Sequence, residues 1–336
     1  MVCRLSSSAV ALSTRTAAGL HIVLPEPVRE LESMRVLLWH VHGTWTNAFV
    51  RGRHHYLVIA DEPQRWPEGV EHVRPDQIAD SHPDVVIFQH PEELDRLQPI
   101  LGTELNAVGK IYLEHNTPSG PAATTRHPVA DRDDLLLVHV TRFNRLMWDS
   151  GSTPATVIPH GIPDPGHRYT GELERQAVVI NEAGRRGRSV GADLLPLFAQ
   201  AAPIDLFGID ADRYSGPGVT AAGNLGLDEL HAEMARRRIY LHTTRWTSLG
   251  LSLIEAMQLG MPVVALGTTE APTSIPPGTG VVSNDPEQLI DAIGLLMKNP
   301  DLAMATGEAA RDHAVERFGL GRFLADWDDA LDRARP

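Results

Sequence analysis

Short apolar runs alternate with helix-like segments in two successive series along this 336-residue chain. The runs are rich in Val, Ile and Leu, as in strands that are buried on both faces of a parallel sheet. The first series lies at 36–41, 54–60, 84–89, 110–113, 135–140 and 157–158, and the second at 177–180, 204–207, 239–242, 262–266 and 281–282. This alternation predicts an α/β protein with two parallel sheets.

Residues 159–171 separate the two series. They read PHGIPDPGHRYTG, with three prolines and three glycines, a composition that interrupts helices and strands alike. We therefore predict two doubly wound, Rossmann-like domains that face a cleft, at residues 34–158 and 172–320. The segment 159–171 would be the hinge between them, and residues 321–336 a C-terminal helix.

The segments between the apolar runs carry helix signals. In residues 91–101 the apolar side chains fall three or four apart, which predicts an amphipathic helix. Asp285-Pro286 and Asn299-Pro300 each place a capping side chain before a proline, an arrangement typical of a helix start.

The first 33 residues differ from the rest of the chain. Residues 1–25 contain no Asp or Glu but carry Arg4, Arg15 and four serines, a composition similar to that of a transit peptide. The alternative, which we favour, is a disordered upstream extension or a mis-called start. Met34 would then be the true start, because it directly precedes the first strong strand.

The overall charge narrows the classes of partner. The chain has 30 Lys and Arg against 43 Asp and Glu, a net charge of −13, which disfavours nucleic-acid binding. Its one cysteine, Cys3, excludes an internal disulfide and a multi-cysteine metal site and fits the reducing cytoplasm. No uncharged apolar stretch approaches 18 residues, so no transmembrane segment is expected. The oligomeric state stays open.

Common nucleotide and metal motifs are missing. The sequence has no complete GxGxxG, no GxxxxGK[ST] and no HExxH. Metal ligands could come from Asp210 with Asp212, or from the histidine pairs 40/42 and 54/55. We favour a solvated turn for the aspartates and chance for the histidines, so no metal cofactor is expected.

Residues 240–266 combine a strand end, a loop and an apolar helix in the sequence YLHTTRWTSLGLSLIEAMQLGMPVVAL. We expect the helix to begin near Ser248, with Gly250 in its first turn, where free N–H groups favour an anion. Glu255 follows about two turns later, and its carboxylate suits the vicinal hydroxyls of a ribose. Gly260 then ends the helix. The alternative is a buried core helix with an exposed Glu255.

This segment resembles the sugar-nucleotide site of retaining glycosyltransferases with the GT-B fold, most closely glycosyltransferase family 4, also called glycosyl transferases group 1. The matches are Gly250, Glu255-Ala256-Met257, Gly260 and Pro262-Val263-Val264. Weaker similarities lie at His42-Gly43-Thr44, Glu114–Pro118 and Val157–Ile162. The resemblance covers roughly residues 34–330 and implies two Rossmann-like domains.

Two positions depart from the family pattern. The family's first motif glutamate falls at Thr247, which can form hydrogen bonds but has no charge. The family's phosphate-binding lysine falls at Val190. Arg185 has the spacing of the family arginine, and Arg186 or Arg188 would supply the missing charge. The alternative is a solvated basic turn.

The resemblance implies a metal-independent transferase that moves a sugar from a nucleotide-diphosphate sugar to a glycan, lipid or small-metabolite acceptor, with retention of anomeric configuration. It implies catalytic roles for His115, Arg185 and Arg188, and donor contacts for Gly43, Arg186, Thr247, Ser248, Leu249, Gly250 and Glu255. Two alternatives stay open: a catalytically inactive sugar-nucleotide-binding subunit, because of Thr247, and a sugar-nucleotide epimerase, which can share this fold without an acceptor.

Overall fold

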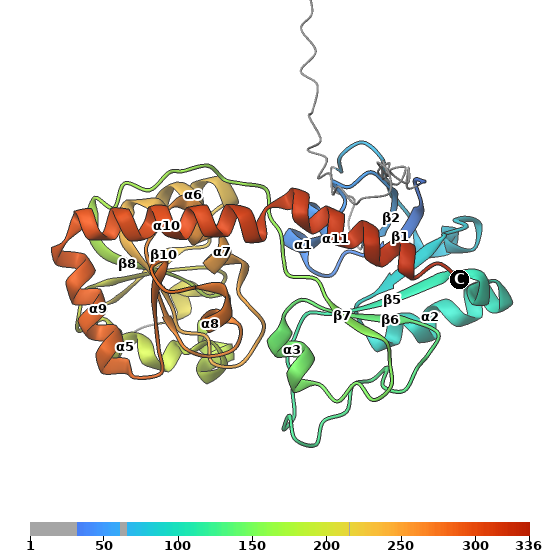
Figure 1. Ribbon diagram of the computed structural model, residues 1–336, viewed down its shortest axis with the longest axis horizontal. Coiled ribbons are helices and arrows are strands. Elements are labelled where there is room, and N and C mark those ends of the chain that lie inside the picture. The colour runs from blue at the N-terminus through green and yellow to red at the C-terminus, as the bar shows by residue number, and fades with distance from the viewer. Residues whose placement is uncertain (1–31, 61–65, 215) are drawn as a thin grey trace, which may run out of the picture. The chain divides into compact units, whose positions relative to one another are not determined.

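The predicted apolar runs form two parallel sheets in the computed structural model, which describes residues 32–60, 66–214 and 216–336. Residues 34–336 make up one compact unit that holds both sheets. The first sheet has the order β3-β2-β1-β4-β5-β6-β7, and Figure 1 labels β1, β2, β5, β6 and β7 of these strands. Its strands are β1 (Arg35–Trp39), β2 (His55–Ile59), β3 (Val70–His72), β4 (Val85–Phe88), β5 (Gly109–Glu114), β6 (Leu136–His139) and β7 (Ala155–Val157).

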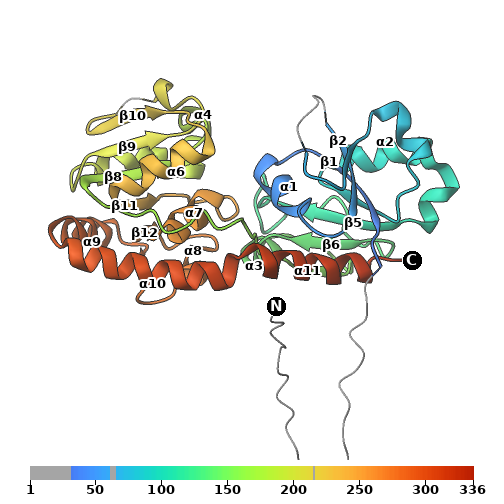
Figure 2. The same cartoon turned by 90° about the horizontal axis from the view of Figure 1, so that it is seen from above.

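The second sheet has the order β10-β9-β8-β11-β12-β13, and Figure 2 shows the succession from β10 to β12. Its strands are β8 (Leu173–Val179), β9 (Ile204–Phe207), β10 (Val219–Gly223), β11 (Arg237–His242), β12 (Val263–Leu266) and β13 (Gly280–Ser283). In both sheets the chain starts on a central strand and reverses its direction of travel once, so each sheet is doubly wound.

Helices pack on these sheets and complete the cores. They are α1 (Gly43–Phe49), α2 (Pro91–Leu101), α3 (Arg142–Met147), α4 (Ala183–Arg186), α5 (Leu195–Phe198), α6 (Leu227–Arg236), α7 (Leu251–Leu259), α8 (Ala271–Ser274), α9 (Pro286–Lys298), α10 (Pro300–Phe318) and α11 (Leu320–Arg333). The predicted start of α9 is confirmed, because the Asp285 carboxylate accepts a hydrogen bond from the Glu287 N–H at 3.0 Å. Pro300 begins α10 as predicted, but the expected Asn299 cap is wrong, because the Asn299 side chain donates to the Leu295 carbonyl at 2.7 Å instead.

The last helix, α11, belongs to the core of the first sheet although it ends the chain. Phe323 and Trp327 are almost fully buried there, together with Trp45 and Phe49 of α1. The chain thus leaves the first sheet through residues 158–172 and returns to it through the junction of α10 and α11. The predicted C-terminal helix at 321–336 corresponds to α11, and its packing in the amino-terminal core was not predicted.

Five elements were not predicted. The strands β3 and β10 lie at sheet edges and lack long apolar runs. The helices α1, α4 and α8 are short, with 7, 4 and 4 residues. Residues 192–198 form a short 3-10 turn followed by α5, with Pro196 near the start of α5. These differences affect element ends and edges but not the architecture.

The expected extension at residues 1–33 lies outside the described ranges, apart from its last two residues. Within those ranges, none of the helices combines the length and the apolar composition needed to span a bilayer.

Candidate functional site

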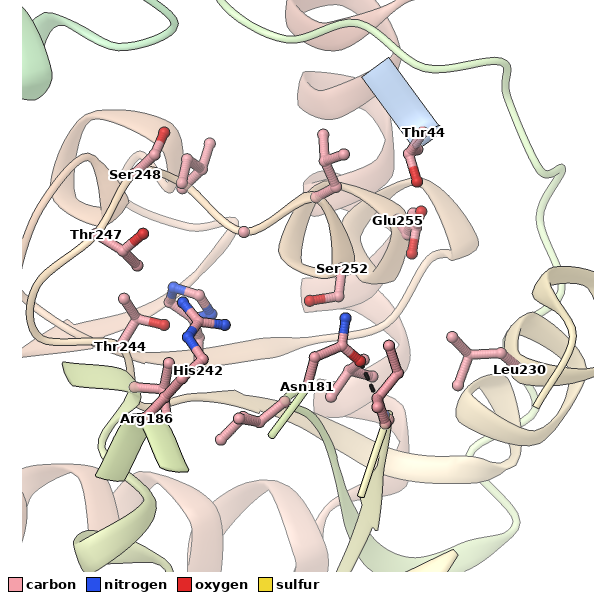
Figure 3. A pocket seen from close by; sticks show the side chains of 18 of the residues that line it. Thr44, Asn181, Arg186, Leu230, His242, Thr244, Thr247, Ser248, Ser252 and Glu255 are labelled. Carbon is pink, nitrogen blue, oxygen red and sulfur yellow. Dashed lines mark hydrogen bonds between the residues drawn. The ribbon is translucent and has the colours of Figure 1, made fainter. Parts of the chain in front are cut away.

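A cavity of about 400 Å³ opens at the carboxyl ends of the strands of the second sheet (Figure 3). We call it the main cavity. It is lined by Thr44, Val179, Ile180, Asn181, Arg186, Val190, Gly208, Ile209, Asn224, Leu225, Leu227, Leu230, His242, Thr244, Thr247, Ser248, Leu249, Gly250, Leu251, Ser252 and Glu255. Its position and size suit a small-molecule ligand, because open α/β sheets bind ligands at the carboxyl ends of their strands.

Glu255 provides the negative charge of the main cavity. It lies on α7 and is 6% exposed, yet its carboxylate accepts no hydrogen bond from the described residues. The nearest cation candidate is His231 on α6, whose Nε2 lies 3.5 Å from the carboxylate. A buried carboxylate without hydrogen-bond donors is costly. Two ligand hydroxyls would provide the missing donors.

Arg186 provides the positive charge of the main cavity. It is half-buried at the end of α4, and burial, followed by the nearby Arg185, lowers the pKa of its guanidinium. Among the described residues, no carboxylate forms an ion pair with Arg186. Figure 3 shows it near His242, on the opposite side of the cavity from Leu230. An unpaired, partly desolvated guanidinium is well suited to bind phosphate.

The other two arginines of this loop lie outside the main cavity. The side chain of Arg185 is 70% exposed and forms an ion pair with Glu182 at 2.5 Å. The side chain of Arg188 is 80% exposed and pairs with Asp193 at 3.0 Å. The structure therefore brings one of the three predicted arginines into the cavity and leaves two at the surface.

Val190 stands at the position of the family's phosphate-binding lysine and gives the wall of the main cavity an apolar side chain there. It is 3% exposed and belongs to the hydrophobic core beneath the second sheet. The neighbouring Gly191 has φ +70°, and a Cβ atom there would lie 2.0 Å from the Thr243 carbonyl oxygen. The arginine loop is thus packed against the loop that follows β11, and its Val190 carbonyl accepts a hydrogen bond from the Thr243 hydroxyl at 2.7 Å.

The start of α7 faces the main cavity. The helix begins at Leu251, three residues later than predicted, and Gly250 is its N-cap. The Ser248 hydroxyl is buried and has no hydrogen-bond partner among the described residues, and Leu249 is buried beside it. First-turn N–H groups can donate hydrogen bonds to an anionic ligand here, and the unpaired hydroxyl can bond to a polar one. Thr247 also lines the cavity (Figure 3).

His242, the last residue of β11, also faces the main cavity. Its Nε2 atom is buried without a hydrogen-bond partner among the described residues, and burial lowers its pKa to about 4. At neutral pH the ring is therefore an uncharged side chain with an unused polar atom.

This low pKa predicts a specific acid sensitivity. An unfolded histidine gains a proton near pH 6.5, whereas folded His242 resists protonation until about pH 4. Stability is therefore complete above pH 6.5 and is lost as the pH falls toward 4. We expect His242→Gln to lose roughly 2 kcal/mol less stability than the wild type between pH 7.5 and pH 5 in urea unfolding. Equal losses in both proteins would contradict this assignment.

Two further predicted site residues, His115 and Gly43, also lie outside the main cavity, in segments that follow strands of the first sheet. His115 follows β5, is 8% exposed, and donates from Nε2 to Gln89 Oε1 at 2.9 Å. Burial, followed by the charges of nearby histidines such as His42, holds its pKa well below the usual range. Gly43 begins α1, where its neighbour Thr44 lines the cavity.

Several cavity residues were missed in the sequence. Asn181 follows β8, and its Oδ1 accepts a hydrogen bond from Ile209 N at 2.9 Å, as drawn in Figure 3. His242 ends β11, and Leu230 comes from α6. The first two could have been found from the rule that ligands meet the carboxyl ends of parallel strands. Nothing in the sequence points to Leu230.

The metal candidates show no clustering. Asp210 forms an ion pair with Arg213 at 3.2 Å. Over the ranges 32–60, 66–214 and 216–336, no group of three or more His, Cys, Asp or Glu side chains is arranged to hold a metal ion.

Known proteins resemble the chain both in sequence and in structure. Residues 215–313 match the family model described as Glycosyl transferases group 1, so this region carries such a domain. The D-inositol 3-phosphate glycosyltransferase of Corynebacterium jeikeium (strain K411) is 39% identical over 72 residues, which are 20% of this chain and 17% of that protein.

Solved structures share the fold. Anabaena HepE, in complex with UDP and glucose, has a TM-score of 0.67 at 13% identity, over 89% of this chain and 100% of HepE. The glycosyltransferase WaaG has a TM-score of 0.64 at 14% identity, over 88% of this chain and 99% of WaaG. A TarM variant of S. aureus, in complex with Fondaparinux, alpha-GlcNAc-glycerol and UDP, has a TM-score of 0.61 at 15% identity, over 74% of this chain and 55% of TarM. The two Rossmann-like domains therefore have the GT-B fold.

Proposed function

We propose that this chain is a retaining glycosyltransferase that takes its donor, a nucleotide-diphosphate sugar, into the main cavity. The single observation that carries the proposal is that two charged side chains with unused hydrogen-bonding capacity line the same cavity. They are the buried carboxylate of Glu255 and the guanidinium of Arg186, which has no ion pair among the described residues. A nucleotide-diphosphate sugar offers hydroxyls to the first and phosphate to the second. The Glycosyl transferases group 1 match and the UDP complexes of HepE and TarM support this ligand class.

In the proposed reaction the bond between the anomeric carbon and the diphosphate oxygen breaks. The acceptor hydroxyl oxygen bonds to the same face of that carbon, and its proton passes to the departing diphosphate. Negative charge grows on the leaving group, so Arg186 and the first-turn N–H groups of α7 would lower the barrier by electrostatic stabilisation. Glu255 would hold the ribose. His115 would contact the sugar or the reacting centre from the amino-terminal domain.

Thr247 bears on which sugar is transferred. It lies at the cavity wall beside Ser248, whose hydroxyl has no partner among the described residues. The two hydroxyls would bind sugar hydroxyls without the charge that the family glutamate provides. The acceptor would be a glycan, a lipid or a small metabolite, and the reaction would take place in the cytoplasm.

A thermal-shift screen of nucleoside diphosphates and their sugars tests the donor class. A ligand at 100 times its Kd should stabilise the folded chain by about 2.7 kcal/mol. Donor hydrolysis, followed as release of nucleoside diphosphate, then separates a transferase from its alternatives. Binding without turnover under any acceptor would indicate a sugar-nucleotide-binding subunit, and conversion of one donor into another would indicate an epimerase.

Metal independence is a further part of the proposal. Arg186 and the start of α7 would neutralise the charge of the diphosphate, so no divalent cation would be needed for that purpose. We expect turnover to be unchanged by excess EDTA. An absolute requirement for Mg²⁺ would contradict this and would direct attention to Asp210 and Asp212.

A further inference from the structure

A second hollow, of about 590 Å³, lies outside the main cavity and contains three arginines. We call it the arginine hollow. It is lined by Arg142, Arg145, Leu146, Thr156, Val157, Pro159 and Arg317. These residues come from α3, from β7 and the segment after it, and from the last turn of α10. None of the lining residues is acidic.

The three arginines differ from their neighbours in having no carboxylate partner among the described residues. On α10, Arg311 pairs with Asp164 at 2.7 Å, and at the start of α11, Arg322 pairs with Asp326 at 2.6 Å. Arg317 lies between them without an ion pair. Its Nε atom is buried and has no hydrogen-bond partner in the described structure.

Three nearby carboxylates do not line the arginine hollow. Glu316 and Asp326 line an adjoining hollow that shares Pro159 and Arg317 with it, and Asp326 is paired there with Arg322. Glu270, which precedes α8, accepts a hydrogen bond at its carboxylate from the Phe143 N–H of α3 at 2.9 Å and does not line the arginine hollow.

Three guanidinium groups line one hollow whose lining contains no carboxylate, so an anion bound there would be attracted by positive charges alone. Arginine is suited to phosphate oxygens in particular, because its planar fork of N–H donors forms paired hydrogen bonds with them. A hydroxyl at Thr156 adds a neutral donor at the same wall. The concentration of positive charge is the more unusual because the whole chain carries −13.

We propose that the arginine hollow is a binding site for a phosphate group, separate from the main cavity. The site shares no lining residue with the main cavity, so it does not depend on the proposed function. The phosphate would come either from a small solute or from a lipid headgroup. Leu146 is 77% exposed beside the arginines, so a separate arm of the experiment tests the lipid headgroup as the source.

The test is calorimetric titration of the full chain with inorganic phosphate at low ionic strength, with chloride at equal ionic strength as the reference anion. We expect Arg145→Gln and Arg317→Gln each to weaken phosphate binding roughly tenfold, the loss of one charged hydrogen-bonding partner. Arg145 is exposed, so its replacement should leave folding intact. Arg317 is half-buried, so the melting temperature of Arg317→Gln is measured to check that this variant still folds.

Two controls separate this site from others. Arg96→Gln removes an exposed arginine of α2 outside the hollow and should leave the affinity for phosphate unchanged. Arg186→Gln removes the cation of the main cavity, so it reports any phosphate bound there, and the binding that remains in this variant should still fall with Arg145→Gln. If phosphate binding were lost with Arg186→Gln but kept in the hollow variants, the ion would bind in the main cavity and the proposal would be wrong.

Cosedimentation with vesicles of neutral phosphatidylcholine, with and without phosphatidic acid, distinguishes the two sources. Binding to the acidic vesicles that falls with Arg145→Gln would support a headgroup as the source. Binding of free phosphate alone would support a small solute. If neither probe binds, or if binding is unchanged by both Arg145→Gln and Arg317→Gln, the site does not exist.

Discussion

Replacing Glu255 with glutamine is expected to weaken the binding of a nucleoside diphosphate by about 1.5–3 kcal/mol, the range for hydrogen bonds to a charged group. Its carboxylate lines the main cavity and accepts no hydrogen bond from the described residues, so the ribose would be its principal partner. The measurement is calorimetric titration of both proteins with the best nucleotide from the screen.

The free protein provides the control for this prediction. Because Glu255 is buried and lacks donors, Glu255→Gln should leave the melting temperature of the unliganded chain unchanged or raise it. Glu308→Gln, which alters an exposed glutamate of α10, should change neither binding nor stability. A variant at Glu255 that melts early but binds nucleotide normally would remove this residue from the site.

Replacing Arg186 with alanine is expected to lower turnover by roughly 10²-fold, as for the loss of one donor that stabilises developing charge. The effect should exceed the loss of donor affinity, because the leaving diphosphate gains charge only as the bond breaks. Initial rates of nucleoside diphosphate release, with the true acceptor or with water, measure it.

Arg185→Ala and Arg188→Ala are matched controls on the same loop. Both side chains are mostly exposed and paired with their own carboxylates, so each change should alter the barrier by no more than about 0.5 kcal/mol. If Arg185→Ala or Arg188→Ala were the damaging variant and Arg186→Ala were silent, the loop would have to rearrange on binding. The phosphate contact would then belong to the arginine whose replacement is damaging, Arg185 or Arg188.

The architecture could be predicted because both sheets are buried on both faces. Runs such as Val85–Phe88 and Val263–Leu266 are continuous and apolar for that reason, and the Pro- and Gly-rich segment between the two series marks the chain's passage from one sheet to the other. Edge strands receive less packing, so β3 and β10 need no such run and left no clear pattern. The role of α11 in the first core depends on contacts distant in sequence, which periodicity cannot show.

The site was only partly predictable, for a related reason. Gly250 and Glu255 lie on one helix, so their spacing along the chain fixed their relation in space. The arginine loop is irregular, and the direction of each side chain depends on local partners such as Glu182 and Asp193. Spacing alone therefore favoured Arg185, whereas Arg186 is the one that lines the cavity.

A crystal structure of the chain with bound nucleoside diphosphate tests the central claim most directly. The account predicts ribose hydroxyls within hydrogen-bond distance of the Glu255 carboxylate, about 2.6–3.0 Å, and phosphate oxygens on Arg186 and the first-turn N–H groups of α7. Nucleotide bound elsewhere, or a main cavity that stays empty at saturating nucleotide, would contradict it.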